Sequence, residues 1–117
     1  MKTDEDPADI VVTAPMSLYA ETFRKLRAAL DVSLSTHPKT VEGEKRGHII
    51  LVCSALQAEG KSTTAISLAR TYAAAGVETI LIDADLRKPT IGKRLGMEDN
   101  PGLIGFINPP SPTKDPE

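Results

Sequence analysis

The sequence has one cysteine, few aromatic residues and no tryptophan. A single cysteine, Cys53, excludes an internal disulfide and any metal site built from several cysteines, and its place in an apolar run predicts a buried thiol. Aromatic residues make up only 3% of the chain, which predicts a core of aliphatic side chains. These scarcities indicate a globular protein of a reducing compartment rather than a disulfide-linked secreted one.

Long hydrophobic runs and an excess of positive charge are also missing. The longest apolar run, Ile49–Cys53, is far shorter than the roughly 18 residues that a membrane span requires, and the acidic start MKTDEDPAD differs from a secretory signal. The net charge of -2 leaves no broad basic face for nucleic acid. We therefore expect a cytoplasmic protein that binds no nucleic acid.

Apolar residues recur at helical spacing in two segments. Ser17–Leu34 predicts an amphipathic helix with Ser17 as its N-cap, and Ser62–Ala75 predicts a second helix that ends at Gly76. A short helical turn is expected near Ile91–Leu95. We expect residues 1–16 to form an extended, mobile arm, residues 17–107 to form one partial domain, and residues 108–117 to be a disordered, proline-rich tail.

Two short apolar runs predict buried β-strands. Gly47–Ser54 and Glu78–Asp83 are rich in β-branched residues and flank the second predicted helix. The order strand, helix, strand predicts an α/β fold of the P-loop NTPase type, with a parallel sheet flanked by helices and preceded by an N-terminal helix. Because 117 residues are few for such a fold, we expect it to be truncated.

The segment ALQAEGKS, residues 55–62, matches the Walker A pattern at every defined position except the first, where Ala55 replaces glycine. A glycine before the helix lets backbone N–H groups approach phosphate oxygens, and the helix N-terminus favours the same anion. The lysine would contact the β- and γ-phosphates of ATP, the serine hydroxyl would bind Mg²⁺, and the threonine would contact the α-phosphate. A turn that merely caps a helix is the alternative. The predicted nucleotide-binding residues are Ala58, Glu59, Gly60, Lys61, Ser62 and Thr63.

Two carboxylates, Asp83 and Asp85, end the second predicted strand in the sequence ILIDADLRKP. Ligands sit at the carboxyl ends of strands in open α/β sheets, and paired carboxylates there suit a divalent cation or accept a proton from an attacking hydroxyl. Together with Ser62 they are the predicted Mg²⁺ ligands, and together with Lys61 they are the predicted catalytic residues. Capping of a loop by the two aspartates is the alternative.

The segment SALQAEGKSTTAISLARTYAAAGVETILIDADLRKP resembles the core signature of the bacterial tyrosine kinases, and the resemblance covers roughly Leu18–Ile107. It implies an ATP-binding protein-tyrosine autokinase, a transferase that regulates capsule and exopolysaccharide biosynthesis. By this resemblance Lys61 and Ser62 bind ATP and Mg²⁺, and Asp83 and Asp85 hold Mg²⁺ and prepare a tyrosine hydroxyl for attack.

A third match is Glu21-x-x-Arg24-x-x-Arg27, which is similar to the helix through which subunits of that family pack into a ring. The resemblance implies a homo-oligomer and a membrane chain-length regulator or activator as partner, which would hold the protein at the inner face of the plasma membrane. Spacing by three places these groups on one helix face, where salt bridges within the helix are the alternative.

The sequence also departs from the family pattern. Gln57 and Ala58 stand where the family has Pro-Gly, no later apolar run ends in an aspartate, and the C-terminal tyrosine cluster is missing. The two tyrosines, Tyr19 and Tyr72, fall on predicted helices, where we expect them to pack. These departures predict a fragment or shortened relative without efficient autophosphorylation.

Two other functions stay open at this point. A non-kinase ATPase switch of the partition or division-positioning type shares the strand-helix-strand core, but such proteins carry a second lysine early in the loop and Ser54–Ala58 contains none. An inactive interaction module that works through the helix of Glu21 and Arg27 is the other alternative.

Overall fold

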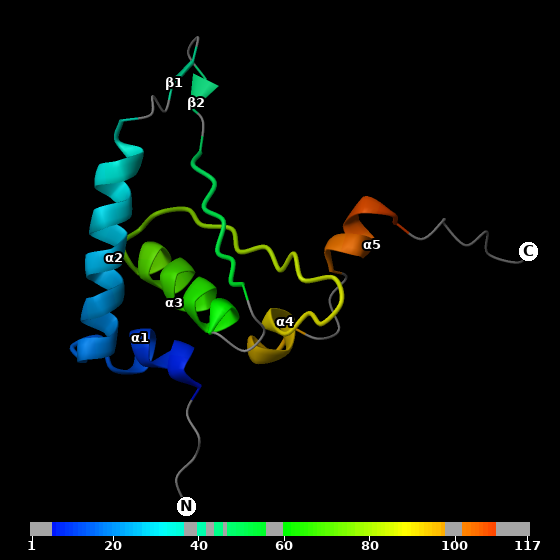
Figure 1. Cartoon of the computed structure of the whole chain (residues 1–117), viewed down its shortest axis with the longest axis horizontal. Helices are drawn as coiled ribbons and strands as arrows, with labels where there is room; N and C mark the ends of the chain where they lie inside the picture. The colour runs from blue at the N-terminus through cyan, green and yellow to red at the C-terminus, as the bar shows by residue number, and fades with distance from the viewer. Residues whose placement is uncertain are drawn as a thin grey trace, which may run out of the picture. The chain divides into compact units, whose positions relative to one another are not determined.

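The structure is a computed structural model that describes residues 6–36, 40–41, 44–45, 47–55, 60–97 and 102–109. The chain forms two compact units, Met1–Ile80 and Leu81–Glu117. The first unit contains the long helices and the hydrophobic core, and the second contains two short helices (Figure 1).

The first unit is built on helices α2 (Leu18–Leu34) and α3 (Lys61–Ala74), which lie side by side in Figure 1. The prediction of both helices is confirmed. The Ser17 hydroxyl accepts the Ala20 N–H at 3.1 Å and caps α2 as predicted. At the end of α3, Gly76 has φ 81, and its N–H and that of Val77 donate to the carbonyls of Ala73 and Tyr72, at 3.0 and 3.1 Å. This is the Schellman arrangement, in which glycine ends a helix.

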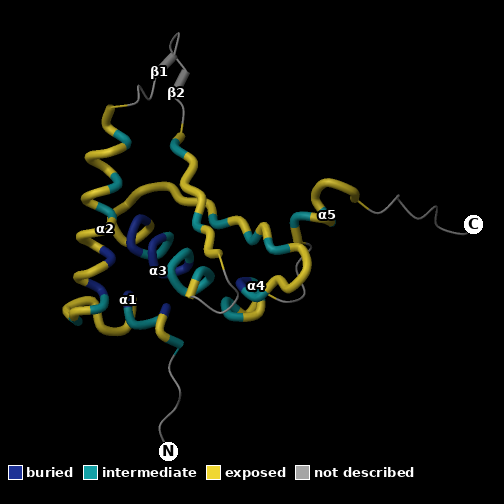
Figure 2. Tube along the Cα trace, viewed as in Figure 1, coloured by how far each residue is buried: buried dark blue, intermediate teal, exposed yellow. Residues whose placement is uncertain are grey.

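The core lies where α2 and α3 meet the N-terminal segment. Its buried members are Val11, Phe23, Leu68 and Tyr72, and Tyr19 packs against them, as Figure 2 shows by the buried stretches of α2 and α3. The core tyrosines also make polar contacts between the helices: the Tyr19 hydroxyl lies 2.9 Å from Ser67 Oγ, and the Tyr72 hydroxyl donates to Asp31 Oδ1 at 2.9 Å. The expected packing role of both tyrosines is confirmed.

The environment of Tyr72 changes its acidity. Burial raises the pKa of the Tyr72 hydroxyl above its ordinary value of 10.0, and the hydrogen bond to Asp31 and the negative charge of Asp31 raise it further. The positive charge of Arg27, whose guanidinium carbon lies 6.0 Å from the centre of the Tyr72 ring, opposes this rise in the pKa. The neutral phenol is therefore the form that the folded unit favours.

The N-terminal segment is helical, where we expected an extended arm. It forms η1 (Pro7–Asp9) and α1 (Ile10–Thr13), and the side chains of Ala8 and Val11 are buried. Arg70 of α3 holds this segment, because its Nη1 donates to the Ala8 carbonyl at 2.8 Å and pairs with Asp9 Oδ1 at 2.6 Å. The expectation of an extended conformation is wrong for these residues, since a partner on α3 supplies the burial that the segment cannot achieve alone.

The predicted parallel sheet is contradicted. Residues 47–54 and 78–83 are extended but form no strand, and in the described part of the chain the only strands are β1 (Thr40–Val41) and β2 (Glu44–Lys45), a two-residue antiparallel pair. Most of the aliphatic side chains expected to be buried are exposed, with Ile49 at 96% and Ile80 at 88%, and only Val52 and Leu81 are half-buried. Figure 2 accordingly draws most of both segments as exposed. A parallel sheet needs neighbouring strands and covered faces, and the described residues provide neither for these two segments.

Cys53 lies in the first of these two segments, over which no described element packs, and this determines its exposure. Its thiol is exposed rather than buried, so the prediction of a structural core cysteine is wrong. Hydrophobic neighbours in the sequence indicate burial only when another element packs over the segment.

The second unit contains α4 (Ile91–Arg94) and α5 (Leu103–Ile107). Helix α4 confirms the short turn expected near Ile91, and Ile91 is its buried residue. Most of α5 is exposed, including Phe106 at 84%. The predicted proline-rich tail, residues 108–117, lies outside the described residues from position 110 onwards.

Candidate functional site

The start of α3 has the backbone geometry that a phosphate site requires. Gly60 is the N-cap residue and has φ 81, a left-handed conformation that residues with a side chain rarely adopt. Its carbonyl accepts the Thr64 N–H at 2.9 Å, which closes the first turn of a 14-residue helix. A Cβ at Gly60 would meet nothing within 4 Å. The glycine is therefore required by its backbone angle and not by crowding from the protein.

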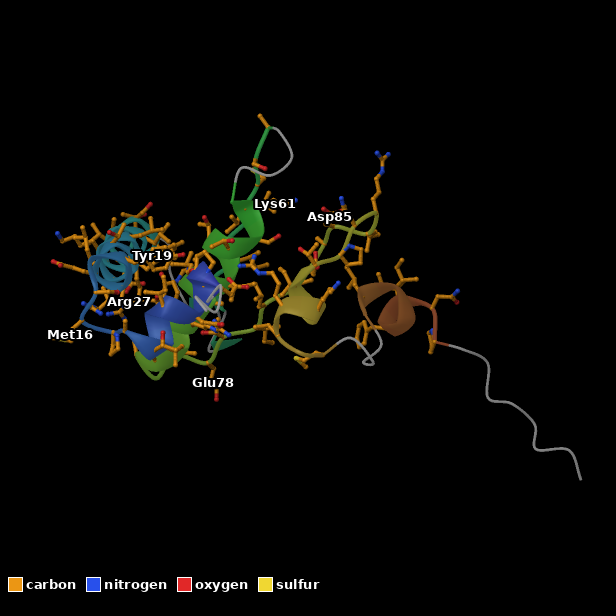
Figure 3. All side chains as sticks on the ribbon, turned by 90° about the horizontal axis from the view of Figure 1, so that it is seen from below. Met16, Tyr19, Arg27, Lys61, Glu78 and Asp85 are labelled. Atoms are coloured by element: carbon orange, nitrogen blue, oxygen red, sulfur yellow. The ribbon has the colours of Figure 1, made fainter. Side chains whose placement is uncertain are left out.

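Three predicted phosphate ligands follow this glycine in the first turn of α3. Lys61, Ser62 and Thr63 are each partly exposed, and Figure 3 shows Lys61 at the beginning of the helix. The amide N–H groups of a first helical turn point towards the helix N-terminus, where the helix dipole is positive. The donor set consists of these amides, one ammonium and two hydroxyls, and it fits an anionic polyphosphate. Ala58 and Glu59, also predicted here, lie outside the described residues.

The two aspartates of the second unit bind backbone amides. Asp83 Oδ1 accepts the Asp85 N–H at 3.1 Å, while Asp83 Oδ2 accepts the N–H groups of Thr90 and Ile91 at 3.0 and 3.2 Å. Asp85 Oδ1 accepts the Lys88 N–H at 3.1 Å. Asp83 thus caps the start of α4 from seven residues upstream, which is the loop-capping arrangement that the spacing left open.

These hydrogen bonds of Asp83 and Asp85 are compatible with binding of a divalent cation. A carboxylate oxygen that accepts backbone N–H bonds can still use a second lone pair, so Asp83 and Asp85 have the chemistry to bind Mg²⁺ while they hold the loop. Over the described positions, no group of three or more His, Cys, Asp and Glu side chains gathers as a metal site. The structure brings Asp83 and Asp85 together in the second unit and brings Lys61 and Ser62 together in the first.

The predicted contact residues of α2 make bonds within the first unit. Glu21 pairs with Lys25 at 3.3 Å, and Arg27 pairs with Asp31 at 4.0 Å, both at helical spacing of four. Arg24 Nη1 donates to the Pro15 carbonyl at 2.5 Å. The intrahelical pairs are those that the alternative reading of this motif describes, although Glu21 takes Lys25 and not Arg24 as its partner.

Sequence reasoning missed the residues that join the N-terminal segment to α3. The contact of Arg70 with Asp9 spans 61 positions, and the contact of Tyr19 with Ser67 spans 48. Neither Arg70 nor Ser67 is among the residues predicted for the site, and no local signal in the sequence indicates their partners. They matter because they fix α3 against the rest of the unit and so fix the helix that carries Lys61.

Comparison with curated proteins places the sequence among bacterial tyrosine kinases and polysaccharide transport proteins. The chain is 40% identical over 95 residues to the succinoglycan biosynthesis transport protein ExoP of Rhizobium meliloti, which is 81% of this chain and 11% of that protein. It is 37% identical over 98 residues to the tyrosine-protein kinase YwqD of Bacillus subtilis, which is 84% of this chain and 38% of that protein.

A third relative, matched over a shorter segment, is also named as a tyrosine-protein kinase. The tyrosine-protein kinase CpsD of Streptococcus pneumoniae is 39% identical over 61 residues, which is 51% of this chain and 27% of that protein. The chain therefore belongs to the family of bacterial tyrosine kinases and polysaccharide chain-length regulators. It spans well under half the length of the curated relatives it matches.

No protein-family model matches the sequence, and no solved structure matches the chain. In the described residues no helix is both long and apolar enough to cross a membrane.

Proposed function

We propose that this chain is the nucleotide-binding part of a protein-tyrosine kinase that regulates exopolysaccharide or capsule biosynthesis. The general role rests on the relatives, which are named as tyrosine-protein kinases and as an exopolysaccharide transport protein. The single observation that carries the nucleotide site is the left-handed Gly60, which opens a 14-residue helix with Lys61 and Ser62 in its first turn. ATP would supply the γ-phosphoryl group for transfer to a tyrosine.

Each residue at the start of α3 has a distinct proposed task. Gly60 turns the backbone so that the following amides converge on phosphate oxygens. Lys61 supplies a mobile positive charge for the β- and γ-phosphates, Ser62 offers its hydroxyl to Mg²⁺, and Thr63 hydrogen-bonds the α-phosphate. Ala58 and Glu59 belong to the same loop and would contribute backbone N–H groups.

The aspartates of the second unit have a proposed double task. Asp83 holds the loop to α4 through three backbone N–H groups, which keeps both carboxylates close together. Asp83 and Asp85 are proposed to bind Mg²⁺, for which Ser62 is a further proposed ligand, and to accept the proton of the tyrosine hydroxyl. A carboxylate whose position is already fixed by hydrogen bonds is better suited to both tasks than a mobile one, because less side-chain entropy is lost on binding.

The proposed partners are further copies of the chain and a membrane regulator. The motif of Glu21, Arg24 and Arg27 would make the contact between copies, and two of its members, Glu21 and Arg24, are exposed on α2. A membrane-bound chain-length regulator or activator would hold the protein, which we propose to be cytoplasmic, at the inner face of the plasma membrane. This proposal rests on the family resemblance alone.

Binding of ADP and ATP in the presence of Mg²⁺, measured by isothermal titration calorimetry, tests the nucleotide site. Lys61→Ala removes one charge-assisted contact and should weaken binding about 10-fold or more. Lys93→Ala is the matched control, because Lys93 is an exposed lysine of α4, and it should bind as the parent does. Unchanged affinity in Lys61→Ala, with folding intact by circular dichroism, would refute the proposed site.

A further inference from the structure

The N-terminal segment, residues 6–14, packs on α3 as a separate element of the first unit. Its side chains Ala8 and Val11 are 1% and 8% exposed, and Val11 belongs to the core that α2 and α3 form. Arg70 of α3 donates to the Ala8 carbonyl at 2.8 Å and pairs with Asp9 at 2.6 Å. These two polar contacts span 62 and 61 positions of the sequence. The surface that receives the segment therefore lies far from it along the chain.

The contact between the segment and α3 combines charge with shape. A carboxylate meets a guanidinium, and two small or β-branched side chains are buried beside this ion pair. A second copy of the chain carries the same segment and the same surface on α3, so it can supply either half of the contact with identical chemistry. The occupant that fits this surface best, besides the chain's own segment, is the segment of another copy.

The connection between the segment and α2, residues 14–17, is a hinge. Two hydrogen bonds keep it folded back: the Ser17 N–H donates to the Ala14 carbonyl at 2.9 Å, and Arg24 Nη1 donates to the Pro15 carbonyl at 2.5 Å. The proposed contact of Arg24 with another copy would release the second of these bonds. Proline favours extended backbone in the residue before it, so an open hinge is accessible at Ala14. An open hinge would direct the segment away from its own α3.

Two apolar side chains at this hinge are exposed to water. Met16 is 92% exposed and Leu18, the first residue of α2, is 77% exposed. In Figure 3 the labelled Met16 side chain lies at the outer edge of the first unit. Two open hinges that pass each other in a dimer would cover such side chains, and this burial favours the dimer. A single folded-back copy leaves both side chains in water.

We propose that two copies of this chain exchange residues 6–14, so that the segment of each copy packs on α3 of the other and Asp9 pairs with Arg70 across the dimer. The exchanged dimer keeps the burial of Ala8 and Val11 and adds contacts at the hinges. Each α3, which carries the phosphate loop at its start, is then held by the neighbouring copy. This exchange is separate from the contact through α2, and it does not depend on nucleotide binding.

Charge reversal on either side of the ion pair tests the exchange. Asp9→Arg opposes two guanidinium groups within one chain, and Arg70→Glu opposes two carboxylates, so each variant alone should release its segment and stay monomeric. An equimolar mixture, refolded together from urea at high protein concentration, regains pairs of opposite charge only if the segments are exchanged. Light scattering after size-exclusion chromatography should show a doubled molar mass for the mixture alone. Native mass spectrometry with one chain ¹⁵N-labelled should show mixed dimers.

The background and the controls isolate the exchange from other contacts. Both chains carry Glu21→Ala and Arg24→Ala, so that the α2 motif proposed to join copies does not contribute. The variant with Asp9→Arg and Arg70→Glu in one chain restores the pair in every copy, and circular dichroism should show it folded. A mixture that stays monomeric while this variant is folded would overturn the exchange, as would dimers of Asp9→Arg alone. Lys61→Ala in both chains should leave the mixed dimer unchanged, so failure of the nucleotide site leaves this test intact.

Discussion

Two glycines at opposite ends of α3 allow backbone strain to be separated from phosphate binding. Gly60 and Gly76 both have φ 81, and a Cβ at either position would meet nothing within 4 Å. Replacement by alanine therefore adds the same backbone penalty at both sites and no steric clash. Only Gly60 precedes the proposed phosphate ligands, so the two variants should differ in nucleotide binding and agree in stability.

The size of the penalty follows from the backbone angle. Alanine in the left-handed region costs about 1–2 kcal/mol, and the smaller freedom of alanine in the unfolded chain returns about 0.4–1 kcal/mol. Gly60→Ala and Gly76→Ala should each lower the free energy of unfolding by about 1 kcal/mol. Gly47→Ala is the control, since Gly47 has no positive φ and an added Cβ there meets nothing within 4 Å, so this variant should lose no stability.

Urea denaturation monitored by circular dichroism at 222 nm measures the stability change, and calorimetry measures ADP affinity. Gly60→Ala should weaken ADP binding because its backbone either stays strained or turns the first amides of α3 away from the phosphates. Gly76→Ala should bind ADP as the parent does. A loss of stability in Gly76→Ala without one in Gly60→Ala would refute the left-handed geometry at Gly60, and equal ADP affinity in all variants would refute its role in binding.

Two further predictions concern the core. Leu68 is 6% exposed in the core, so Leu68→Ala should lower the free energy of unfolding by about 3 kcal/mol. Val12 is 62% exposed, so Val12→Ala should change the free energy of unfolding by less than about 0.5 kcal/mol. Similar urea midpoints for the two variants would contradict this core. The pKa of the Tyr72 hydroxyl lies above 10.0 in the folded protein, so the phenol ionises first in the unfolded chain as the pH rises above 10. The parent should therefore lose stability over this pH range. Tyr72→Phe removes the hydroxyl, so the variant should lose less stability. Identical pH profiles of the two proteins in alkaline urea denaturation would show that the Asp31 contact and burial do not perturb this phenol.

Local signals in the sequence predicted the ends of the helices well. Ser17 caps α2, and Gly76 ends α3, because capping depends on side-chain and backbone groups within a few residues of each other. The phosphate loop motif likewise placed a glycine where the backbone turns to φ 81, directly before a helix. Such features need no distant partner.

The predicted strands failed for the opposite reason. An apolar run such as that around Ile49 specifies a strand only if other strands pair with it and other elements cover it. The spacing of Asp83 and Asp85 had a similar limit, since it suited both a cation site and a loop cap. The positions of the Thr90 and Ile91 amides, which both donate to Asp83, showed that Asp83 caps the loop.

By itself, the sequence determined the two long helices, the glycine turn before Lys61 and membership of the kinase family, since each depends on residues near one another in the chain. Only the tertiary structure decided that the N-terminal segment folds back onto α3 through Arg70, and that Tyr19 of α2 contacts Ser67 of α3. Those arrangements depend on contacts across dozens of residues, whose free energy appears only when α1, α2 and α3 are packed together.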